Sequence, residues 1–301
     1  KVPIFPFHTW LPLAHVEAPT SISVILAGVL LKMGTYGFLR ISYPLLPGEV
    51  ITFACILALL GVINIIWGAL NAIAQRDMKK MVAYSSVSHM GYVLLGMAAV
   101  VSLDRAGAEA GMNGAVMQMF NHGTITAMLF LLVGVLYDQA HHRWIVYPDN
   151  YEDKELAGKL GFGGLASKMP IYSGLVALAF FAGLGLPALS GFISEALCFM
   201  GGFSAGETLG HSNSFIRTLT IIGTLGILLN AIYFLRAYQR VFLGPFNKAY
   251  DKLKDITKRE LITIVPIAFF VLLLGVYPAP LLNLVKHAMS EIISIIHMFG
   301  G

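Results

Sequence analysis

The chain has 301 residues, of which 57% are hydrophobic and only 12% are charged, whereas a soluble domain carries about 25% charged residues. This composition excludes a water-soluble enzyme, a nucleic-acid-binding protein and a disordered tail. The net charge of +4 therefore has to be interpreted loop by loop. The two cysteines, Cys55 and Cys198, lie inside apolar runs and do not form the pattern of a disulfide framework, an iron–sulfur site or a zinc site. Because the first residue is Lys1, we expect a longer membrane protein that is truncated on its N-terminal side.

Apolar runs long enough to cross a bilayer follow one another along the chain. A membrane helix needs about 20 mostly apolar residues, and the absence of a two-residue alternation excludes a barrel. The sequence therefore predicts an all-α polytopic membrane protein. Residues 1–18 are expected to form the end of a broken transmembrane helix and a connecting loop, and residues 278–301 a C-terminal amphipathic segment. Within 19–277 we expect seven transmembrane helices, at about 20–41, 51–73, 80–101, 112–136, 170–203, 215–241 and 260–277.

Lysine and arginine are shared unevenly between the loops. The loops near 74–80, 137–169 and 242–259 hold three, four and five of these residues, whereas the intervening loops hold only Arg105. Short loops that are rich in lysine and arginine stay on the cytoplasmic side of a membrane. The three basic loops are therefore expected to face the cytoplasm, or the matrix or stroma of an organelle.

Four ionisable residues fall where a charge is costly. Lys32, His89 and His122 lie near the centres of three different runs, and Glu195 lies in a fourth. Such a residue at membrane depth costs at least about 2.5–3.5 kcal/mol and suggests a functional role by default. For either histidine, a hydrogen bond to a neighbouring helix is an equally good explanation. A lysine, two histidines and a glutamate at one depth are suited to passing protons along a chain.

The run 170–203 contains an expected break. One straight helix of this length would measure about 51 Å, against roughly 30 Å of hydrocarbon. Pro187 follows Gly183 and Gly185 within the run, and a proline removes a backbone donor and clashes with the preceding turn. A broken helix that carries a charge, here Glu195, is typical of transporters.

Other motifs are interpreted as follows. The first twelve residues hold a second interruption, with three prolines around Lys1, His8 and Trp10. The glycine pattern at 183–188 has the spacing of the dinucleotide-binding fingerprint, but no βαβ unit surrounds it. We therefore do not expect a nucleotide site there. The pair His141-His142 lacks the spacing of metal ligands and is expected to be solvated.

Three stretches carry a family resemblance. They are Phe-His-Thr-Trp-Leu-Pro at 7–12, continuing through 15–20, Leu-Ala-Gly-Val-Leu-Leu-Lys at 26–32, and Ala-Tyr-Ser-Ser-Val-Ser-His-Met-Gly at 83–91. These stretches resemble the antiporter-like, proton-pumping subunits of respiratory complex I, the NADH:quinone oxidoreductase. Within that family, Glu195 favours the M type (chain 4 in mitochondria), because the L and N types usually carry lysine there. Leu13 departs from the family, which commonly has aspartate at that position.

The resemblance implies the C-terminal half of an antiporter-like, inverted-repeat helix bundle with broken helices. It implies a proton-translocating role that is driven by redox chemistry in other subunits, without bond-making chemistry in this chain. The residues that would translocate protons are Lys1, Lys32, His89, His122 and Glu195, with His8 and Pro187 in support.

The resemblance also implies the surroundings of the chain. No cofactor is expected in this chain, and NAD, FMN, iron–sulfur clusters and quinone are expected in partner subunits. The expected partners are L-type and N-type membrane subunits and the lipid bilayer, with no nucleic acid. The expected location is an energy-transducing membrane, here a bacterial cytoplasmic (inner) membrane. Two alternatives share the fold: a subunit of an Mrp-type cation/proton antiporter and the membrane arm of an energy-converting hydrogenase. A purely structural membrane scaffold is a third, which Lys32 argues against.

Overall fold

The computed structural model describes residues 1–149, 151, 153–154, 158–209 and 214–300. Within these residues the regular elements are helices, and the β interactions are isolated bridges, so the predicted all-α class is confirmed. The helices are α1 (Trp10–Glu17), α2 (Thr20–Ile25), α3 (Leu31–Gly37), α4 (Tyr43–Leu45), α5 (Pro47–Ala74), α6 (Met78–Ala98), α7 (Arg105–Ala140), α8 (Pro170–Leu184), α9 (Ser190–Ser204), α10 (Phe215–Gly223), α11 (Leu225–Phe242), α12 (Lys258–Val276) and α13 (Ala279–Gly300).

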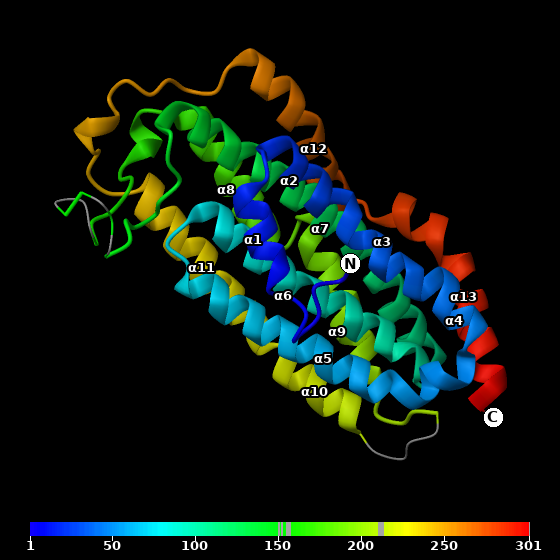
Figure 1. Ribbon diagram of the computed structural model, residues 1–301. Helices are drawn as coiled ribbons and strands as arrows, with labels where there is room; N and C mark the ends of the chain where they lie inside the picture. The colour runs from blue at the N-terminus through cyan, green and yellow to red at the C-terminus, as the bar shows by residue number, and fades with distance from the viewer. Residues whose placement is uncertain (150, 152, 155–157, 210–213, 301) are drawn as a thin grey trace.

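Seven helical stretches among the described residues are long and apolar enough to cross a membrane, by length and composition. They are Thr20–Leu45, Pro47–Ala74, Met78–Val101, Arg105–Ala140, Phe215–Phe242, Lys258–Val276 and Ala279–Phe299. The first of them joins α2, α3 and α4 through two π-helical stretches, η1 (Leu26–Leu30) and η2 (Phe38–Ser42). Nearly all of α6 and most of α7 are buried, whereas the outer helices are mostly exposed. The bundle is therefore built around α6 and α7, as Figure 1 shows.

The expected break in the run 170–203 is present. Helix α8 ends at Gly185, whose φ of 77° is left-handed, and α9 begins at Ser190. Pro187 lies in the turn between them. Neither α8 nor α9 is long enough to cross a membrane alone, so the pair forms one discontinuous element with its break inside the bundle.

Helices α12 and α13 lie end to end along α7 (Figure 1). Helix α12 ends against the break, because a Cβ on Gly275 would lie only 2.5 Å from Leu189 Cα. Helix α13 then runs beside the start of α7, where Arg105 Nη2 donates to Ser290 Oγ at 2.8 Å. Most of the segment 278–301, expected as an amphipathic end, is thus the helix α13, in which Ala279–Phe299 is by length and composition also apolar enough for a span.

The irregular first residues are held by α5. Asn64 on α5 donates from Nδ2 to Pro3 O at 3.0 Å and accepts from Phe5 N at 2.8 Å. Backbone that leaves the helix at membrane depth needs such partners within the protein. This segment leads into α1, which ends at Glu17.

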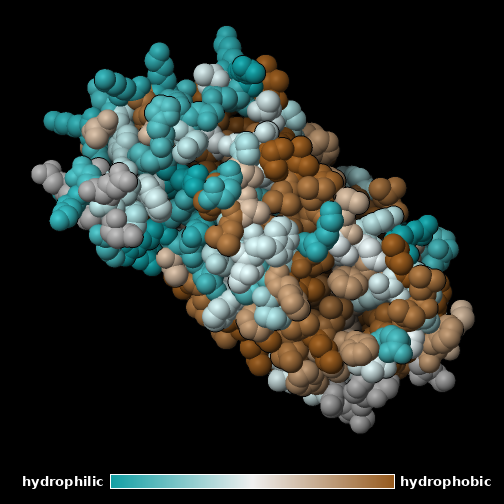
Figure 2. All heavy atoms as spheres, in the orientation of Figure 1, coloured by the Kyte–Doolittle hydropathy of each residue, from teal (hydrophilic) through white to brown (hydrophobic). Residues whose placement is uncertain are grey.

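The described residues of the segments 75–77, 141–169 and 243–257 meet at one end of the bundle, which we call the basic end. Figure 2 shows hydrophilic side chains gathered there, above a mostly hydrophobic flank. Ile145 N donates to Arg76 O at 2.7 Å, and Gly164 N donates to Leu243 O at 3.2 Å. Arg143 Nε also pairs with Asp77 Oδ2 at 2.5 Å. The loops predicted to share one side of the membrane therefore form one layer.

His142 is not solvated as expected, although its neighbour His141 is exposed. The His142 ring stacks on Phe162 at 4.4 Å between centroids, and its Nε2 lies 2.7 Å from the Tyr250 hydroxyl. Burial lowers the pKa of His142 to about 4. The local sequence contains no sign of this packing, because Phe162 and Tyr250 are distant in the chain.

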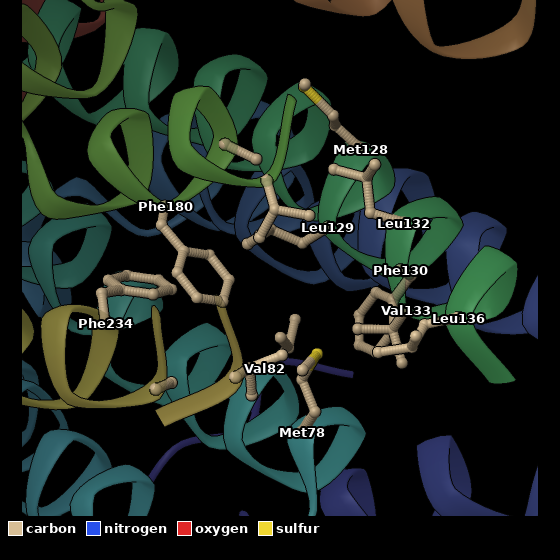
Figure 3. Packing of buried hydrophobic residues seen from close by; sticks show 14 of the residues in the cluster. Met78, Val82, Met128, Leu129, Phe130, Leu132, Val133, Leu136, Phe180 and Phe234 are labelled. Atoms are coloured by element: carbon tan, nitrogen blue, oxygen red, sulfur yellow. The ribbon is translucent and has the colours of Figure 1, made fainter. Parts of the chain in front are cut away.

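The apolar core of the basic half joins four helices. Figure 3 shows Met78 and Val82 of α6 near Leu129 of α7, Phe180 of α8 and Phe234 of α11. Where lipid surrounds the helices, the close packing of such side chains holds the helices together, rather than their removal from water. This cluster holds the helices that carry the polar groups described below.

Helices α5 and α6 pack through glycine. A Cβ on Gly91 would lie 2.7 Å from Ile65 Cγ1 and 2.8 Å from Ile65 N, which is closer than real contacts allow. Small residues that let backbones approach are the usual means of helix packing in membranes. Gly91 is therefore required at this crossing.

Gly91→Ala is expected to destabilise the protein, because overpacking a tight contact costs about 1–3 kcal/mol. The matched control is Gly174→Ala, where a Cβ meets nothing within 4 Å and only the gain in helix propensity of about 1 kcal/mol remains. Thermal unfolding of the full-length protein in detergent measures both. Equal melting temperatures for the two variants would contradict the close packing.

Acid should destabilise the basic end through His142. Its folded-state pKa of about 4 lies below the unfolded value of about 6.5, so the unfolded chain takes up the proton first. Stability is then unaffected above pH 6.5 and falls as the pH drops toward 4. We expect the melting temperature of the wild type to fall more between pH 7.5 and 4.5 than that of His142→Phe, which keeps the ring stack. Parallel pH profiles of the two proteins would contradict this.

Candidate functional site

Lys32 reaches across from α3 to α7. Its Nζ donates to Ala27 O and lies 2.7 Å from Nδ1 of His122. The π-helical stretch η1, which includes Ala27, directly precedes α3, and such stretches are frequent at functional sites. The helices approach closely here, because a Cβ on Gly123 would lie 2.8 Å from Gly28 O. The missing side chain of Gly123 thus allows the close approach that brings the lysine to its partner.

The row continues from His122 to α6 and α9. The rings of His122 and His89 are 5.5 Å apart between centroids, and His89 Nδ1 lies 3.2 Å from Glu195 Oε1. All four side chains, including Lys32, are at least nine-tenths buried. We call Lys32, His122, His89 and Glu195 the polar row. The structure thus brings together four of the five residues that the sequence predicts for proton transfer.

A small cavity lies beside the two histidines. Its volume is about 10 Å³, which is about one water-sized sphere. Nε2 of His89 and Nε2 of His122 have no hydrogen-bond partner among the described residues. The other residues that line the cavity include Ser85, Gln118 and Glu195. The site is polar enough for a single water molecule to bridge the 5.5 Å step between the rings.

The protons of the polar row can be assigned from its contacts. Lys32 Nζ carries only donors when it is charged, so His122 Nδ1 has to accept in their 2.7 Å contact. His122 Nε2 then carries the ring proton and is a donor toward the cavity; this tautomer is assigned from the hydrogen bonds. With Lys32 charged and His122 accepting, the pair holds one positive charge rather than two.

Glu195 is positioned by the break. A Cβ on Gly185 would lie 2.9 Å from Glu195 Oε2, so the left-handed glycine provides both the turn and the room for the carboxylate. Pro187, predicted as a supporting residue, shapes the same turn. The backbone break and the buried acid thus form one feature.

Three polar residues near Glu195 were not predicted. Ser194 Oγ donates to Gln118 Oε1 at 2.5 Å, and Asn121 Nδ2 donates to Ser190 O at 2.7 Å. These bonds tie α7 to the first turns of α9. The signal in the sequence is the placement of Gln118 and Asn121 one helical turn apart, just before His122.

Lys1 and His8 lie apart from these contacts. Lys1 is exposed and lies beside α3, where a Cβ on Gly34 would be 3.1 Å from Lys1 Cβ. His8 is buried and accepts at Nε2 from Trp67 Nε1 of α5 at 3.0 Å. Among the described residues, neither side chain contacts the polar row. Their predicted roles in proton transfer stay predictions.

Comparisons with known proteins place the chain among respiratory membrane subunits. A family model described as NADH:quinone oxidoreductase/Mrp antiporter, TM, matches residues 1–223. NADH-quinone oxidoreductase subunit M of Rickettsia conorii is 42% identical over 97% of this chain and 53% of its own length. Subunit M of Rhodobacter capsulatus is 40% identical over 99% of this chain and 52% of its own length. The chain thus spans about half the length of the curated relatives it matches.

Solved structures have the same fold. Respiratory complex I from Thermus thermophilus with bound NADH contains a chain that matches with a TM-score of 0.79 and 29% identity, over 97% of this chain and 56% of that chain. A chain of the Mrp complex from Dietzia sp. DQ12-45-1b matches with a TM-score of 0.79 and 17% identity, over 99% of this chain and 59% of that chain. The second likeness shows the fold alone. The predicted antiporter-like helix bundle is therefore confirmed.

If Glu195 takes part in proton transfer as the sequence predicts, Gly185→Ala is expected to impair that transfer, because the new Cβ displaces the Glu195 carboxylate. The matched control is Gly244→Ala, where φ is 87° but a Cβ meets nothing within 4 Å. Both variants carry a left-handed strain of about 1–2 kcal/mol, and only the first touches Glu195. Proton translocation and assembly of the full-length protein measure the difference. Equal rates in the two variants would show that Glu195 tolerates the shift.

Proposed function

This chain belongs to the membrane family shared by NADH:quinone oxidoreductases and Mrp antiporters, and we propose that it is about half of an M-type, proton-translocating subunit of a NADH:quinone oxidoreductase. Relatives named subunit M are 40–42% identical to it over nearly its whole length. Because the chain spans about half of those relatives, the activity of the whole protein is inferred from this half.

The observation that carries the proposal is the continuity of the polar row. Four ionisable groups follow one another from α3 through α7 and α6 to α9. Lys32 Nζ lies 2.7 Å from His122 Nδ1, and the ring centroids of His122 and His89 are 5.5 Å apart. His89 Nδ1 then lies 3.2 Å from Glu195 Oε1. Burying a charge without a partner is far more costly than burying an apolar side chain. A purely structural scaffold would therefore be more stable with apolar side chains at these four positions. A buried row of groups that can exchange protons is suited to proton transfer across the plane of the bundle.

In this proposal Lys32 receives a proton and gives it to His122. His122 then passes the proton through the cavity to His89. Glu195 then receives it and releases it toward the other side of the membrane. Lys1 and His8 belong to the route by which the row is supplied from the preceding part of the subunit. The basic end faces the cytoplasm of a bacterial inner membrane.

The energy source lies outside this chain. We assign NAD, FMN, the iron–sulfur clusters and quinone to partner subunits, and L-type and N-type membrane subunits to its flanks. This chain is then a non-redox translocase subunit that responds to events elsewhere in the complex.

A subunit of an Mrp-type cation/proton antiporter is the second candidate, because the family description and the fold of the Mrp complex include it. The same polar row would then move protons against sodium or potassium, without NADH. The names of the relatives favour the first candidate.

Lys32→Met is expected to abolish proton translocation, because it removes the group that loads His122 while keeping the volume of the side chain. The control is Lys168→Met, which removes a lysine paired with Asp251 at 3.0 Å at the basic end and should leave translocation intact. Inside-out membrane vesicles with the full-length subunit and NADH as the donor provide the measurement.

Two outcomes separate the candidates. Normal translocation in an assembled Lys32→Met variant would refute the polar row as the proton route. Translocation that depends on a sodium or potassium gradient and is indifferent to NADH would favour the antiporter.

A further inference from the structure

Two arginines on α11 lie side by side without an anion. Arg236 and Arg240 are one helical turn apart, where like charges repel, and both line a small pocket between α11, α6 and the end of α5. Among the described residues, neither guanidinium has a hydrogen bond or an ion pair. An arginine cannot lose its charge in a protein. The repulsion within the pair is therefore left uncompensated by the chain itself.

The acids of the neighbouring layer are already paired. Ile145, which lines the pocket, belongs to the basic end and donates from its N–H to Arg76 O. The side chain of Arg76 pairs with Asp149. The carboxylate of Asp77 pairs with Arg143. The surroundings of the pocket therefore stay positively charged.

The pair lies at the depth where lipid headgroups meet hydrocarbon. Helix α11 ends at Phe242 at the basic end, so Arg240 and Arg236 lie about 3 Å and 9 Å from that end along the helix axis. Ile232 and Leu228, one and two turns further from the basic end, are apolar and exposed. One side of the helix thus changes from apolar to cationic, in the order in which a phospholipid presents its acyl chains and its phosphate.

The pocket fits one oxygen atom rather than a whole headgroup. Its volume is about 10 Å³, which is about one water-sized sphere. Gln75 lines it and donates one proton of Nε2 to Asn71 O at 2.9 Å, which leaves the second proton for another acceptor. A phosphate at the mouth of the pocket can place one oxygen inside, while its other oxygens accept hydrogen bonds from the two guanidinium groups.

We propose that Arg236 and Arg240 bind the phosphodiester of an anionic phospholipid in the leaflet at the basic end, with its acyl chains along Ile232 and Leu228. Basic pockets between transmembrane helices are suited to such headgroups. A lipid with a net negative charge is favoured over a zwitterionic one, because the positive group of a zwitterionic headgroup would be repelled by two arginines. The site lies outside the polar row and does not depend on the proposed function.

The test measures lipid binding to the full-length subunit, purified in detergent and depleted of lipid. Thermal unfolding is followed with phosphatidylglycerol, phosphatidylcholine or inorganic phosphate added over the same range of concentrations. We expect phosphatidylglycerol to raise the melting temperature of the wild type most, because a ligand that binds only the folded state stabilises it. In the double variant Arg236→Gln/Arg240→Gln, the affinity for phosphatidylglycerol is expected to fall at least about tenfold, since one hydrogen bond to a charged group contributes about that factor or more.

The matched control is the double variant Lys252→Gln/Lys254→Gln. It removes two exposed positive charges from the same end of the molecule, at residues that do not line the pocket, and should keep the affinity of the wild type. Native mass spectrometry counts the phosphatidylglycerol molecules that each protein retains, and we expect one fewer on the arginine variant than on the control. If the double arginine variant does not fold, Arg236→Gln, at an exposed position, takes its place.

Four results would overturn the proposal. A wild type that does not prefer phosphatidylglycerol to phosphatidylcholine would indicate two arginines that only reach toward water. An equal loss of affinity in the arginine and lysine variants would assign the attraction to the whole basic end. Inorganic phosphate that binds as tightly as phosphatidylglycerol would make the ligand a free anion. Loss of partner subunits from the arginine variant, without a lipid preference in the wild type, would make the ligand an acidic residue of a neighbouring membrane subunit.

Discussion

The 2.7 Å contact between Lys32 and His122 is the constraint on which the rest of the site depends. A buried amine needs a partner, because an unpaired charge away from water is far more costly than any single hydrogen bond is favourable. To provide one, α3 and α7 have to approach within the reach of a lysine, and Gly123 lacks the side chain that would collide with Gly28 O. The π-helical stretch η1 also places Ala27 O where Lys32 can donate to it. Helix packing and proton chemistry therefore depend on the same few residues.

The break between α8 and α9 is a second place where the conformation of the backbone accommodates an ionisable group. The left-handed turn at Gly185 leaves room for the Glu195 carboxylate, and Asn121 Nδ2 donates to Ser190 O at the start of α9. The end of α12 closes over the same turn through Gly275. Irregular backbone inside a membrane protein is stable only when protein or trapped water forms hydrogen bonds with its N–H and C=O groups. Here neighbouring helices contribute such partners. The acid that ends the polar row is consequently held in a fixed position.

The sequence predicts these features unequally, for physical reasons. Lys32, His89, His122 and Glu195 could be found because the cost of a charge at membrane depth depends on the residue type and its place in the run. The break at Pro187 could be found because proline acts on its own helix. The contacts of Gln118 and Ser194 could not, because neutral polar residues are common at membrane helix interfaces and their partners are set by tertiary packing. His142 was wrongly expected to be solvated, because Phe162 and Tyr250 cover it from distant segments.

The charges along the polar row would also bias the direction of the proposed proton transfer. A proton added to His122 lies beside the charge of Lys32, whereas a proton on His89 lies 3.2 Å from the Glu195 carboxylate. Attraction at one end and repulsion at the other are both strong where water is scarce, so in the proposed function a positive charge on His122 would move toward His89. Once it has left, Lys32 can give its own proton to His122, and the vacant amine can be loaded again. A change in the charge near Lys32, made elsewhere in a larger assembly, would therefore start or stop the sequence without moving a helix.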